Sequence, residues 1–494
     1  MSLIRVFLPV AAVLLFPVAS CTPLLGDAAA RAVDRSLPED YPVVPDGENS
    51  AGLLIDSFFD DPKLLALVDE ALSNNQELNI VRQEFVIAQS EILARRGEYL
   101  PFVGAGAGAE IEKVGEYTSQ GASDASDEIR PGRRVPEHLQ NYVLGLSASW
   151  EIDIWNKLRD ATKSAVMRYL STVEGRNVLI TQLVAEIAHT YYELLALDSQ
   201  LDVLNRNIQI QSDALRIVRA EKNAGRVTEL AVQRFEAEVL DTRSRVFEIR
   251  QAMVKSENYL NFLVGRFPQS IARENAAWLA GTPPVVRTGV PVQLLENRPD
   301  IRRAELELKA AKLDVDVARK SFYPSLSLEA AVGVEAFRPE SLTVLPESIL
   351  YNAASNLTAP LINRRALTAG YYSANSRQMQ AVLSFERTLR EAYMETVNLL
   401  AAISNLTSTY QLKAQQVATL ESAVAISNQL FVSARADYME VLLTRRDALN
   451  SQMELIETKK QQFSAIIDMY KALGGGWRRA STPEPEGNPD LPVK

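Results

Sequence analysis

The pattern of apolar and polar positions changes abruptly at two prolines. After Pro324, residues 325–336 alternate between an apolar side of Leu, Ala and Val and a second side of Ser, Glu, Ala and Gly. A period of two residues is typical of a β-strand, whereas the charged pattern before this proline has helical spacing. The sequence RRGEYLPFVGAGAGAE, residues 95–110, makes the same change at Pro101. Proline suits such a joint, because it cannot continue a helix and favours extended geometry in the preceding residue.

Each joint is followed by a polar loop and then by a second alternating stretch. We therefore expect four strands, at about residues 101–117, 140–154, 324–337 and 349–362. The apolar positions of the second and fourth stretches fall on one face and comprise Tyr142, Leu144, Leu146, Ala148, Trp150, Ile152 and Ile154, then Ile349, Tyr351, Ala353, Leu357, Ala359 and Leu361. Acidic residues occupy the opposite face, where we expect them to meet water: Glu151, Asp153, Glu329 and Glu335.

One very long helical pattern follows the second strand of each pair. Residues 157–223 contain no Pro and a single Gly, and residues 366–435 contain one Gly near their start. At 1.5 Å per residue each helix would be about 100 Å long. Patterns longer than about 25 residues indicate coiled-coil packing rather than a globular core. Each rod then reverses, the first at a turn that contains Gly225, and shorter helices return to about Phe267 and Leu473.

These elements form two copies of one plan. Similar helix starts, NNQEL at 74–78 and NRPDI at 297–301, open the two copies. We expect a lipidated N-terminal segment and equatorial region at 21–73 and a disordered tail at 478–494. The first repeat covers 74–285, with its helical hairpin at about 157–267. The second repeat covers 286–477, with its hairpin at about 366–473. The tail is rich in Pro and poor in large apolar residues, a composition typical of disorder.

Residues 1–20 have the pattern of a signal peptide. Arg5 precedes an apolar run from Val6 to Val18, and small residues follow directly before Cys21. This order of charge, apolar run and small residues is typical of secretory signals. The ending VASC resembles a bacterial lipobox, in which cleavage leaves the cysteine as the new N-terminus with a diacylglyceryl group on its sulfur. Ordinary signal cleavage beside a coincidental cysteine is the alternative.

Composition narrows the classes of function. The net charge of -10 leaves no basic stripe to replace phosphate counterions, which argues against nucleic acid as a partner. Cys21 is the one cysteine, and His138 and His189 are the two histidines, so neither a disulfide framework nor a metal site is indicated. No G-x-S-x-G or H-E-x-x-H motif occurs. We therefore expect no enzymatic activity, no catalytic residue, no cofactor and no bound metal.

Two local motifs look chemical but have structural explanations. Arg298-Pro299-Asp300 is a standard helix start, since proline fits the first turn and an acid there is favoured by the helix dipole. The sequence LGGGW at 473–477 lacks the Lys-Ser/Thr pair and the preceding strand of a phosphate-binding loop. We expect it to end a helix, with Trp477 packed beside the end.

The strands are the elements that could cross a membrane. No uninterrupted apolar run of 18 residues follows Cys21, and each strand has roughly the length required to cross a bilayer obliquely. Four strands are too few to close a barrel, and an open edge in lipid leaves backbone groups unsatisfied. Two copies of the chain would supply eight strands and three copies twelve, and the spacing alone does not choose between them. A soluble strand pair capping a helical bundle is the alternative that periodicity leaves open.

Six motifs and their order along the chain resemble the TolC-like outer membrane factors. The resemblance is to the lipoprotein branch called the NodT family, which serves resistance-nodulation-division efflux pumps. Taken singly each motif is modest, and together they span nearly all of the chain after Cys21. They are SFFDDPKLLALVDEALSNNQEL (57–78), WEIDIWNKLRDA (150–161), LLENRPDIRRAELELKAA (294–311), FYPSLSLEA (322–330), LTAPLINRRAL (357–367) and LGGGW (473–477).

The resemblance implies an α+β membrane protein. Three copies would form a twelve-stranded outer-membrane barrel, continued by a helical barrel in the periplasm, and Pro101 and Pro324 would mark where one becomes the other. Loops 118–139 and 337–348 would lie outside the cell. The duct would be passive, with a periplasmic adaptor and an inner-membrane transporter as partners. The cargo stays open, because drug efflux, metal efflux and type I protein secretion share this outer component. A structural helical lipoprotein without a pore is a further alternative.

The resemblance also places a periplasmic gate and adaptor tip where the long helices turn. The candidate residues are Gly225, Glu229, Arg435, Asp437, Met439, Glu440 and Leu443. The second turn lacks Gly, so we expect Asp437 to adopt the left-handed geometry that Gly225 supplies in the first. Three copies would make a ring of Glu229, Asp437 and Glu440 carboxylates. This ring would favour cations and resist closure through like-charge repulsion unless Arg226 or Arg435 offsets it. Leu443 aligns with an Asp of many relatives, so a partly apolar constriction of Met439 and Leu443 competes with an acidic one. The alternative is that these acidic side chains are only solvent-exposed residues at a helix end, without a role in gating.

Overall fold

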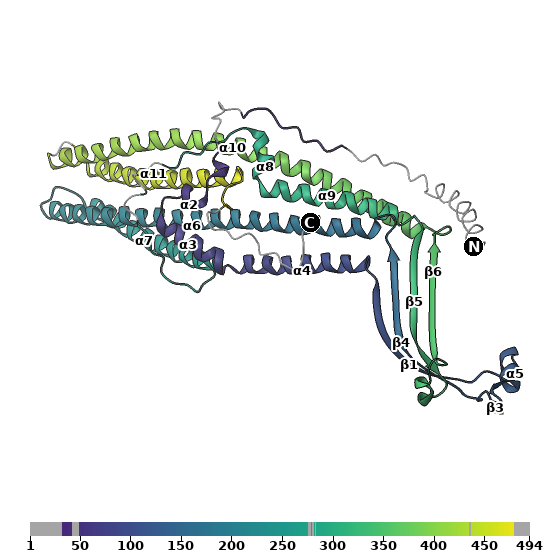
Figure 1. Ribbon diagram of the computed structural model, residues 1–494. Coiled ribbons are helices and arrows are strands. Elements are labelled where there is room, and N and C mark those ends of the chain that lie inside the picture. Colours follow the sequence, from purple (N-terminus) through teal and green to yellow (C-terminus); the bar gives the residue numbers. More distant parts are fainter. Residues whose placement is uncertain are drawn as a thin grey trace. The chain divides into compact units, whose positions relative to one another are not determined.

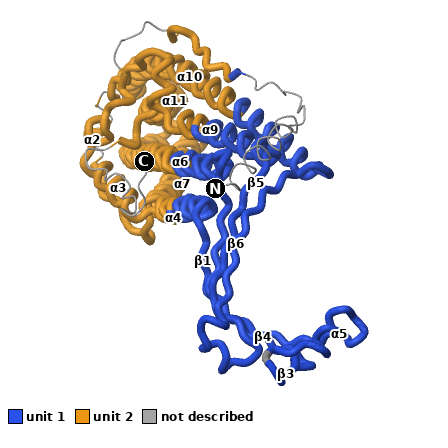
Figure 2. The backbone as a smooth tube through the Cα atoms, turned by 45° about the vertical axis from the view of Figure 1, so that its right-hand side comes forward, with its two compact units in different colours: residues 1–32, 86–170, 306–383 blue, residues 33–85, 171–305, 384–494 orange. Residues whose placement is uncertain are grey.

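The structure is a computed structural model that describes residues 32–41, 49–274, 278, 281, 283–433 and 436–478 (Figure 1). Cys21, the expected signal peptide, Arg435 and residues 479–494 of the expected tail lie outside the described residues. The chain divides into two compact units, which Figure 2 shows in blue and orange. Each unit draws on both sequence repeats: unit 1 contains residues 86–170 and 306–383, and unit 2 contains 33–85, 171–305 and 384–478 of the described chain.

Unit 1 contains a four-stranded antiparallel sheet with the strand order β1-β4-β5-β6. The strands are β1 (Phe102–Glu112), β4 (Leu139–Ile152), β5 (Ser325–Ala336) and β6 (Ile349–Thr358). All four lie where alternation indicated strands, although β1 and β6 end several residues before the expected limits. The contact between β4 and β5 joins the two repeats within one sheet.

The register aligns the apolar positions of all four strands on one face. Leu146 on β4 lies opposite Ala105 on β1 and Val332 on β5, and Val332 in turn lies opposite Tyr351 on β6. The other face carries the glycines of β1 and the acidic positions, with Ser149 opposite Glu329. Because a one-residue slip would exchange the two faces, this register preserves the separation that the sequence pattern predicts.

Long helices run from the sheet region. They are α4 (Gln76–Glu98), α6 (Lys157–Asn223), α9 (Pro299–Lys320) and α10 (Arg365–Val432), and the boundary between the units falls within all four. Helices α7 (Glu229–Val264) and α11 (Tyr438–Ala472) return antiparallel to α6 and α10 (Figure 1). None of the described helices combines the length and the apolar character needed to cross a membrane.

Unit 2 has the largest hydrophobic core. The side chain of Tyr191 on α6 is fully buried there and donates a 2.7 Å hydrogen bond to Asp61, which also caps α3 (Pro62–Asn74). Phe58 stacks on Tyr470 of α11 with ring centroids 3.9 Å apart. These contacts connect the segment before the first repeat with α6 and with α11, the last helix. The remaining short elements are η2 (Ser50–Gly52), α2 (Ile55–Phe58), α5 (Ser119–Ser126), β2 (Glu128–Arg130), β3 (Arg133–Arg134), η3 (Pro291–Gln293), α8 (Leu294–Asn297) and η4 (Pro339–Thr343).

The motifs Arg298-Pro299-Asp300 and LGGGW (473–477) lie at helix ends, which their side chains and backbone stabilise. Pro299 occupies the first position of α9, and the Arg298 side chain binds Asp300, Glu395 at 2.8 Å and the carbonyl of Ala472 at 2.7 Å. Helix α11 ends at Ala472, after which Gly474 adopts a left-handed φ of 93°. The indole of Trp477 donates to the Gly474 carbonyl at 2.9 Å. Both structural interpretations are confirmed.

Candidate functional site

Two pairs of strand–helix junctions lie in unit 1. Before the strands, α4 ends at Glu98 and β1 begins after Pro101, while α9 ends at Lys320 and β5 begins after Pro324. After the strands, residues 153–156 connect β4 to α6 and are called the first corner, and residues 359–364 connect β6 to α10 and are called the second corner. Thus the prolines mark the entry to each strand pair, and the corners mark the exit.

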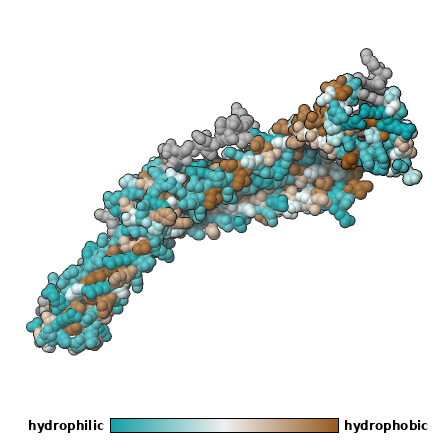
Figure 3. All heavy atoms as spheres, turned by 90° about the horizontal axis from the view of Figure 1, so that it is seen from below, coloured by the Kyte–Doolittle hydropathy of each residue, from teal (hydrophilic) through white to brown (hydrophobic). Residues whose placement is uncertain are grey.

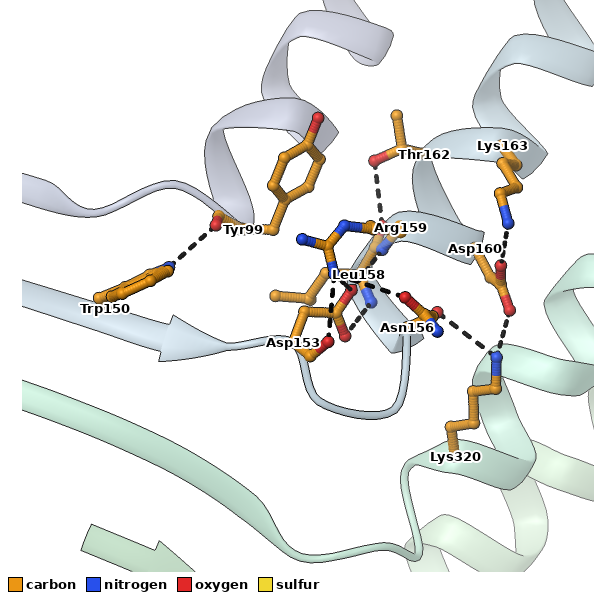
Figure 4. Close-up of polar contacts among 10 residues, drawn as sticks. All are labelled: Tyr99, Trp150, Asp153, Asn156, Leu158, Arg159, Asp160, Thr162, Lys163 and Lys320. Atoms are coloured by element: carbon orange, nitrogen blue, oxygen red, sulfur yellow. Dashed lines mark hydrogen bonds and ion pairs between the residues drawn. The ribbon is translucent and has the colours of Figure 1, made fainter. Parts of the chain in front are cut away.

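Aromatic side chains hold the prolines and the first corner together. The indole of Trp150 donates a 3.0 Å hydrogen bond to the carbonyl of Tyr99, just before Pro101 (Figure 4). The indole of Trp155 donates to the carbonyl of Pro324 at 2.7 Å, and its ring meets that of Tyr323 edge-on at 5.2 Å. These hydrogen bonds satisfy backbone carbonyls that neither the ending helix nor the beginning strand uses.

Asp153 corrects one expectation from the sequence, because it does not face water. Its side chain is 3% exposed and lies beyond the end of β4. The carboxylate accepts hydrogen bonds from the backbone N–H groups of Leu158 at 3.2 Å and Arg159 at 2.9 Å, as Figure 4 shows. It therefore satisfies free donors in the first turn of α6, where an acid is also favoured by the helix dipole.

Asp160 lies between two lysines at the same junction. Lys163 contacts it at 2.9 Å, and Lys320 at the end of α9 forms a second ion pair with it (Figure 4). Burial alone would raise the pKa of the Asp160 carboxyl, but the two lysines outweigh it and hold that pKa below its ordinary value. The cluster links the start of α6 in the first repeat with the end of α9 in the second.

The first helical turn contains Gly225 and Glu229, two of the candidate gate residues. Gly225 has a left-handed φ of 76°, and the N–H groups of Gly225 and Arg226 bond back to Lys222 and Glu221, each at 2.9 Å. This closes the end of α6 as the sequence predicts. Glu229 begins α7 and forms an ion pair with Lys222.

The second helical turn differs from the expectation at Asp437, which is not left-handed. Its φ and ψ are −80° and 152°, an extended conformation at the position directly before α11. Extended geometry is normal for the residue that precedes a helix, so the prediction of a glycine substitute here was wrong. Glu440 and Leu443 follow on α11 and share a groove with Ile426, Leu430 and Asp447.

Met439 and Arg445 connect the two hairpins near these turns. The Met439 sulfur accepts a 3.0 Å contact from Arg234 of α7. Arg445 donates to Asn428 of α10 at 2.7 Å and to the Ile210 carbonyl of α6 at 3.4 Å. Burial lowers the pKa of Arg445. Sequence reasoning did not single out Arg445, because nothing in its local pattern marks an arginine that reaches a neighbouring helix.

Across the described residues, no group of three or more His, Cys, Asp or Glu side chains is arranged to hold a metal ion. His189 instead lies 3.1 Å from Asp468 on α11. Burial would raise the pKa of Asp468, but His189 and Lys471 lower it.

Comparison with known proteins identifies the family. The profile of the family described as outer membrane efflux protein matches residues 67–266 and 290–475. The pyoverdine export outer membrane protein OpmQ of Pseudomonas aeruginosa is 27% identical over 420 residues, covering 85% of this chain and 86% of OpmQ. The probable outer membrane lipoprotein SilC of Salmonella typhimurium is 23% identical over 421 residues, covering 85% of this chain and 87% of SilC.

A solved structure shows the same fold. The crystal structure of the open state of the MtrE outer membrane channel of Neisseria gonorrhoeae has a TM-score of 0.79 and 21% identity, covering 91% of this chain and 98% of that one. The chain belongs to the outer membrane efflux protein family. It is an outer membrane component of an efflux system, and the resemblance found in its motifs is confirmed.

Proposed function

We propose that three copies of this chain form a passive exit duct for small molecules. Each copy would contribute its four strands to a twelve-stranded barrel in the outer membrane, and the long helices would continue the duct into the periplasm. The open sheet carries this proposal: in the described part of the chain β1 and β6 each pair on one side only, and one face of the sheet is predominantly apolar. Closure through neighbouring copies removes the edges that lipid does not tolerate.

Exposed apolar side chains on the helices also favour association. Phe247 on α7 and Leu412 on α10 are both exposed. Figure 3 shows apolar patches set among polar residues on one face of the chain. Apolar patches on a single chain are typical of surfaces that another chain covers.

The two faces of the sheet would have different surroundings in such a duct. The apolar face would meet lipid, and the face that carries Glu110, Glu329 and Glu335 would line the water-filled interior. Energy would come from an inner-membrane transporter of the resistance-nodulation-division class, reached through a periplasmic adaptor that docks on the helical turns. Cargo would pass without chemical change, so no cofactor is implied.

Cys21 would anchor each copy in the membrane. The sequence before it has the order of a lipoprotein signal, and the relative SilC is described as a probable lipoprotein. Mass spectrometry of the mature N-terminus should find Cys21 first in the chain and lipidated. An unmodified Cys21, or cleavage elsewhere, contradicts the anchor without affecting the duct.

Oligomer mass and ion conductance of the purified protein test the duct. In detergent we expect a trimer, and in a planar bilayer we expect discrete channels. Leu146→Arg and Leu328→Arg place a cation on the lipid face, which costs about 2–4 kcal/mol near the bilayer centre, so both should insert poorly. The neighbouring substitutions Ser147→Arg and Ser327→Arg change the interior face and should still insert. A stable monomer without conductance would overturn the proposal.

A further inference from the structure

A groove lies in unit 2 between the start of α4, the helix α6 and the end of α7. Its volume is about 740 Å³, within the range of about 300–1,000 Å³ that is typical of small-molecule sites. Its floor is apolar, because the buried side chains of Leu183 on α6 and Leu263 on α7 line it. The groove therefore has the size and the apolar base required to bind an organic molecule.

The end of α7 fixes one wall of the groove. Gly265 ends this helix with a left-handed φ of 87°. A Cβ atom built on Gly265 would lie 2.6 Å from the carbonyl oxygen of Asn74, so the end of α7 lies directly against the junction of α3 and α4. Across this junction the Asn75 side chain donates a 2.8 Å hydrogen bond to the carbonyl of Leu263. These contacts form the wall within one chain, without a ligand.

Three aromatic side chains at the rim of the groove are exposed. The exposed fractions are 45% for Tyr259, 65% for Phe262 and 92% for Phe267. Tyr259 and Phe262 lie about one turn apart on α7, and their rings stack with centroids 6.4 Å apart and planes at 21°. Aromatic rings gathered around a concave surface are typical of ligand sites, and their faces attract cations.

Two carboxylates give the groove a negative charge. Glu186 on α6 accepts a hydrogen bond from the Tyr259 hydroxyl at 3.2 Å, and Glu77 lies in the first turn of α4. Burial raises the pKa of the Tyr259 hydroxyl, and the negative charges of Glu186 and Glu77 raise it further. Neither carboxylate forms an ion pair with any residue in the described part of the chain.

Arg266 is the one basic residue among the described residues that line the groove, and its charge is already balanced. It forms an ion pair with Glu70 on α3, and its Nε donates to the side chain of Asn261 at 2.7 Å. Glu77 and Glu186 are therefore the uncompensated charges beside the aromatic rings. Carboxylates and aromatic faces both attract a cation, and the apolar floor favours a cation with an apolar body.

We propose that this groove binds amphipathic organic cations. The apolar body of the ligand lies on Leu183 and Leu263, and the aromatic rings of the rim enclose it. The positive charge of the ligand faces Glu77 and Glu186. The site lies within one copy of the chain, so it goes beyond the proposed duct and does not depend on it.

Two ions of the same shape and opposite charge test the site. Tetraphenylphosphonium and tetraphenylborate each carry four phenyl rings around a central atom, so they match in apolar surface and differ in charge. Isothermal titration calorimetry of the full chain in nonionic detergent measures the affinity of each ion. A titration into detergent alone corrects for uptake by micelles. We expect saturable binding of tetraphenylphosphonium and about ten-fold weaker binding of tetraphenylborate, a factor of about three for each carboxylate.

Substitutions in the groove should weaken the binding of tetraphenylphosphonium. Glu186→Gln should weaken it about three- to five-fold, because the amide still accepts from Tyr259 but carries no charge. Phe262→Leu should weaken it about two- to five-fold, because the ring face is lost and an apolar side chain stays. The matched control is Glu248→Gln, an exposed carboxylate about 16 Å from Tyr259 along α7, beyond the screening length at physiological salt. It should bind as the wild type does.

Other results would overturn the site. Equal binding of both ions, unchanged by Glu186→Gln, would show an apolar groove without a preference for charge. Binding of the cation that neither Glu186→Gln nor Phe262→Leu weakens would place it elsewhere on the chain. A protein of trimer mass without saturable binding would show that a second copy covers the groove, and the proposed duct would stand. A monomer that binds the cation as expected would support the site and contradict the duct.

Discussion

Gly145 on β4 lies directly opposite Gly333 on β5, where the two sequence repeats meet. A Cβ atom built on Gly145 would lie 2.7 Å from the Val332 carbonyl oxygen, and one on Gly333 would lie 2.4 Å from the Leu144 carbonyl oxygen. Both distances are too short for real contacts, and the obstructing atoms are backbone. The junction between the repeats therefore has no room for a side chain at either position.

Gly145→Ala and Gly333→Ala should each lower the free energy of unfolding by about 1–3 kcal/mol, because the strands must move apart. Urea denaturation in detergent, followed by circular dichroism, measures the change. Gly106→Ala on β1 is the matched control, since a Cβ there would have no atom within 4 Å. Equal effects of all three substitutions would show that loss of glycine flexibility, rather than close approach, dominates.

Asp153→Ala should destabilise the first turn of α6 by about 0.5–2 kcal/mol, the usual range for losing a side chain that accepts from helix N–H groups. Hydrogen exchange at the Leu158 and Arg159 amides should become faster, because these are the donors that Asp153 satisfies. Glu151→Gln removes a neighbouring carboxylate that pairs with Lys157 instead. It should leave the exchange of those two amides unchanged, so faster exchange in both variants would count against the specific role of Asp153.

The ion pairs of Asp160 should make stability depend on pH in the acid range. Its pKa is lower in the folded chain than in the unfolded chain, so its contribution is fully present above the unfolded value of about 3.9. The contribution is lost as the pH falls through the folded pKa. In urea denaturation, Asp160→Asn should be less stable than the wild type at pH 7, and this difference should shrink below about pH 4.

The control for that experiment is an exposed acid in a surface pair. Asp213→Asn removes one carboxylate beside Arg216, which lies 3.6 Å away. Such exposed pairs contribute about 0–1 kcal/mol, so the variant should follow the wild type at every pH. A constant difference between wild type and Asp160→Asn down to pH 2 would show that Asp160 acts through packing and not through its charge.

Single-channel recording should distinguish the effects of the acidic residues in the two helical turns on ion preference. Asp437→Asn and Glu440→Gln should lower the preference for cations, because no described residue forms an ion pair with either carboxylate. Glu229→Gln should change the preference least, since Lys222 already neutralises Glu229. Leu443→Ala should raise conductance if this side chain narrows the duct. Unchanged conductance and selectivity in all four variants would remove the gate from these turns.

Alternation and helical period were sufficient to place the main elements of this fold. Residues 325–336 alternate without interruption, and β5 covers this same range. The helix expected at 157–223 is α6, because a long sequence without Pro offers the backbone no interruption. Alternation and helical spacing both reflect the burial of one face of an element. This burial depends on residues close together in sequence, so one sequence is enough to detect it. The family motifs supplied what periodicity left open, the class of function.

Single side chains were harder to predict, because their roles depend on where an element ends. Asp153 has the correct parity for the acidic face, but β4 stops before it and the carboxylate turns to the next helix. Asp437 was assigned by analogy with Gly225, although the residue before a helix needs no left-handed geometry. The ion pair of Asp160 with Lys320 joins residues far apart in sequence, and only the packing of α6 against α9 brings them together. No local pattern could reveal it.

One row of the sheet has a consequence for what can pass. Gly106, Gly145 and Gly333 lie in register on adjacent strands, on the face that would form the interior. In the proposed duct, three of the four strands of each copy would present only backbone to the solute at this level. The bore would be wider there by the height of a side chain over most of its circumference, and it would offer few side chains that could bind a cargo. Such a wall would discriminate poorly between molecules, which would leave the sorting of cargo to the components that deliver it.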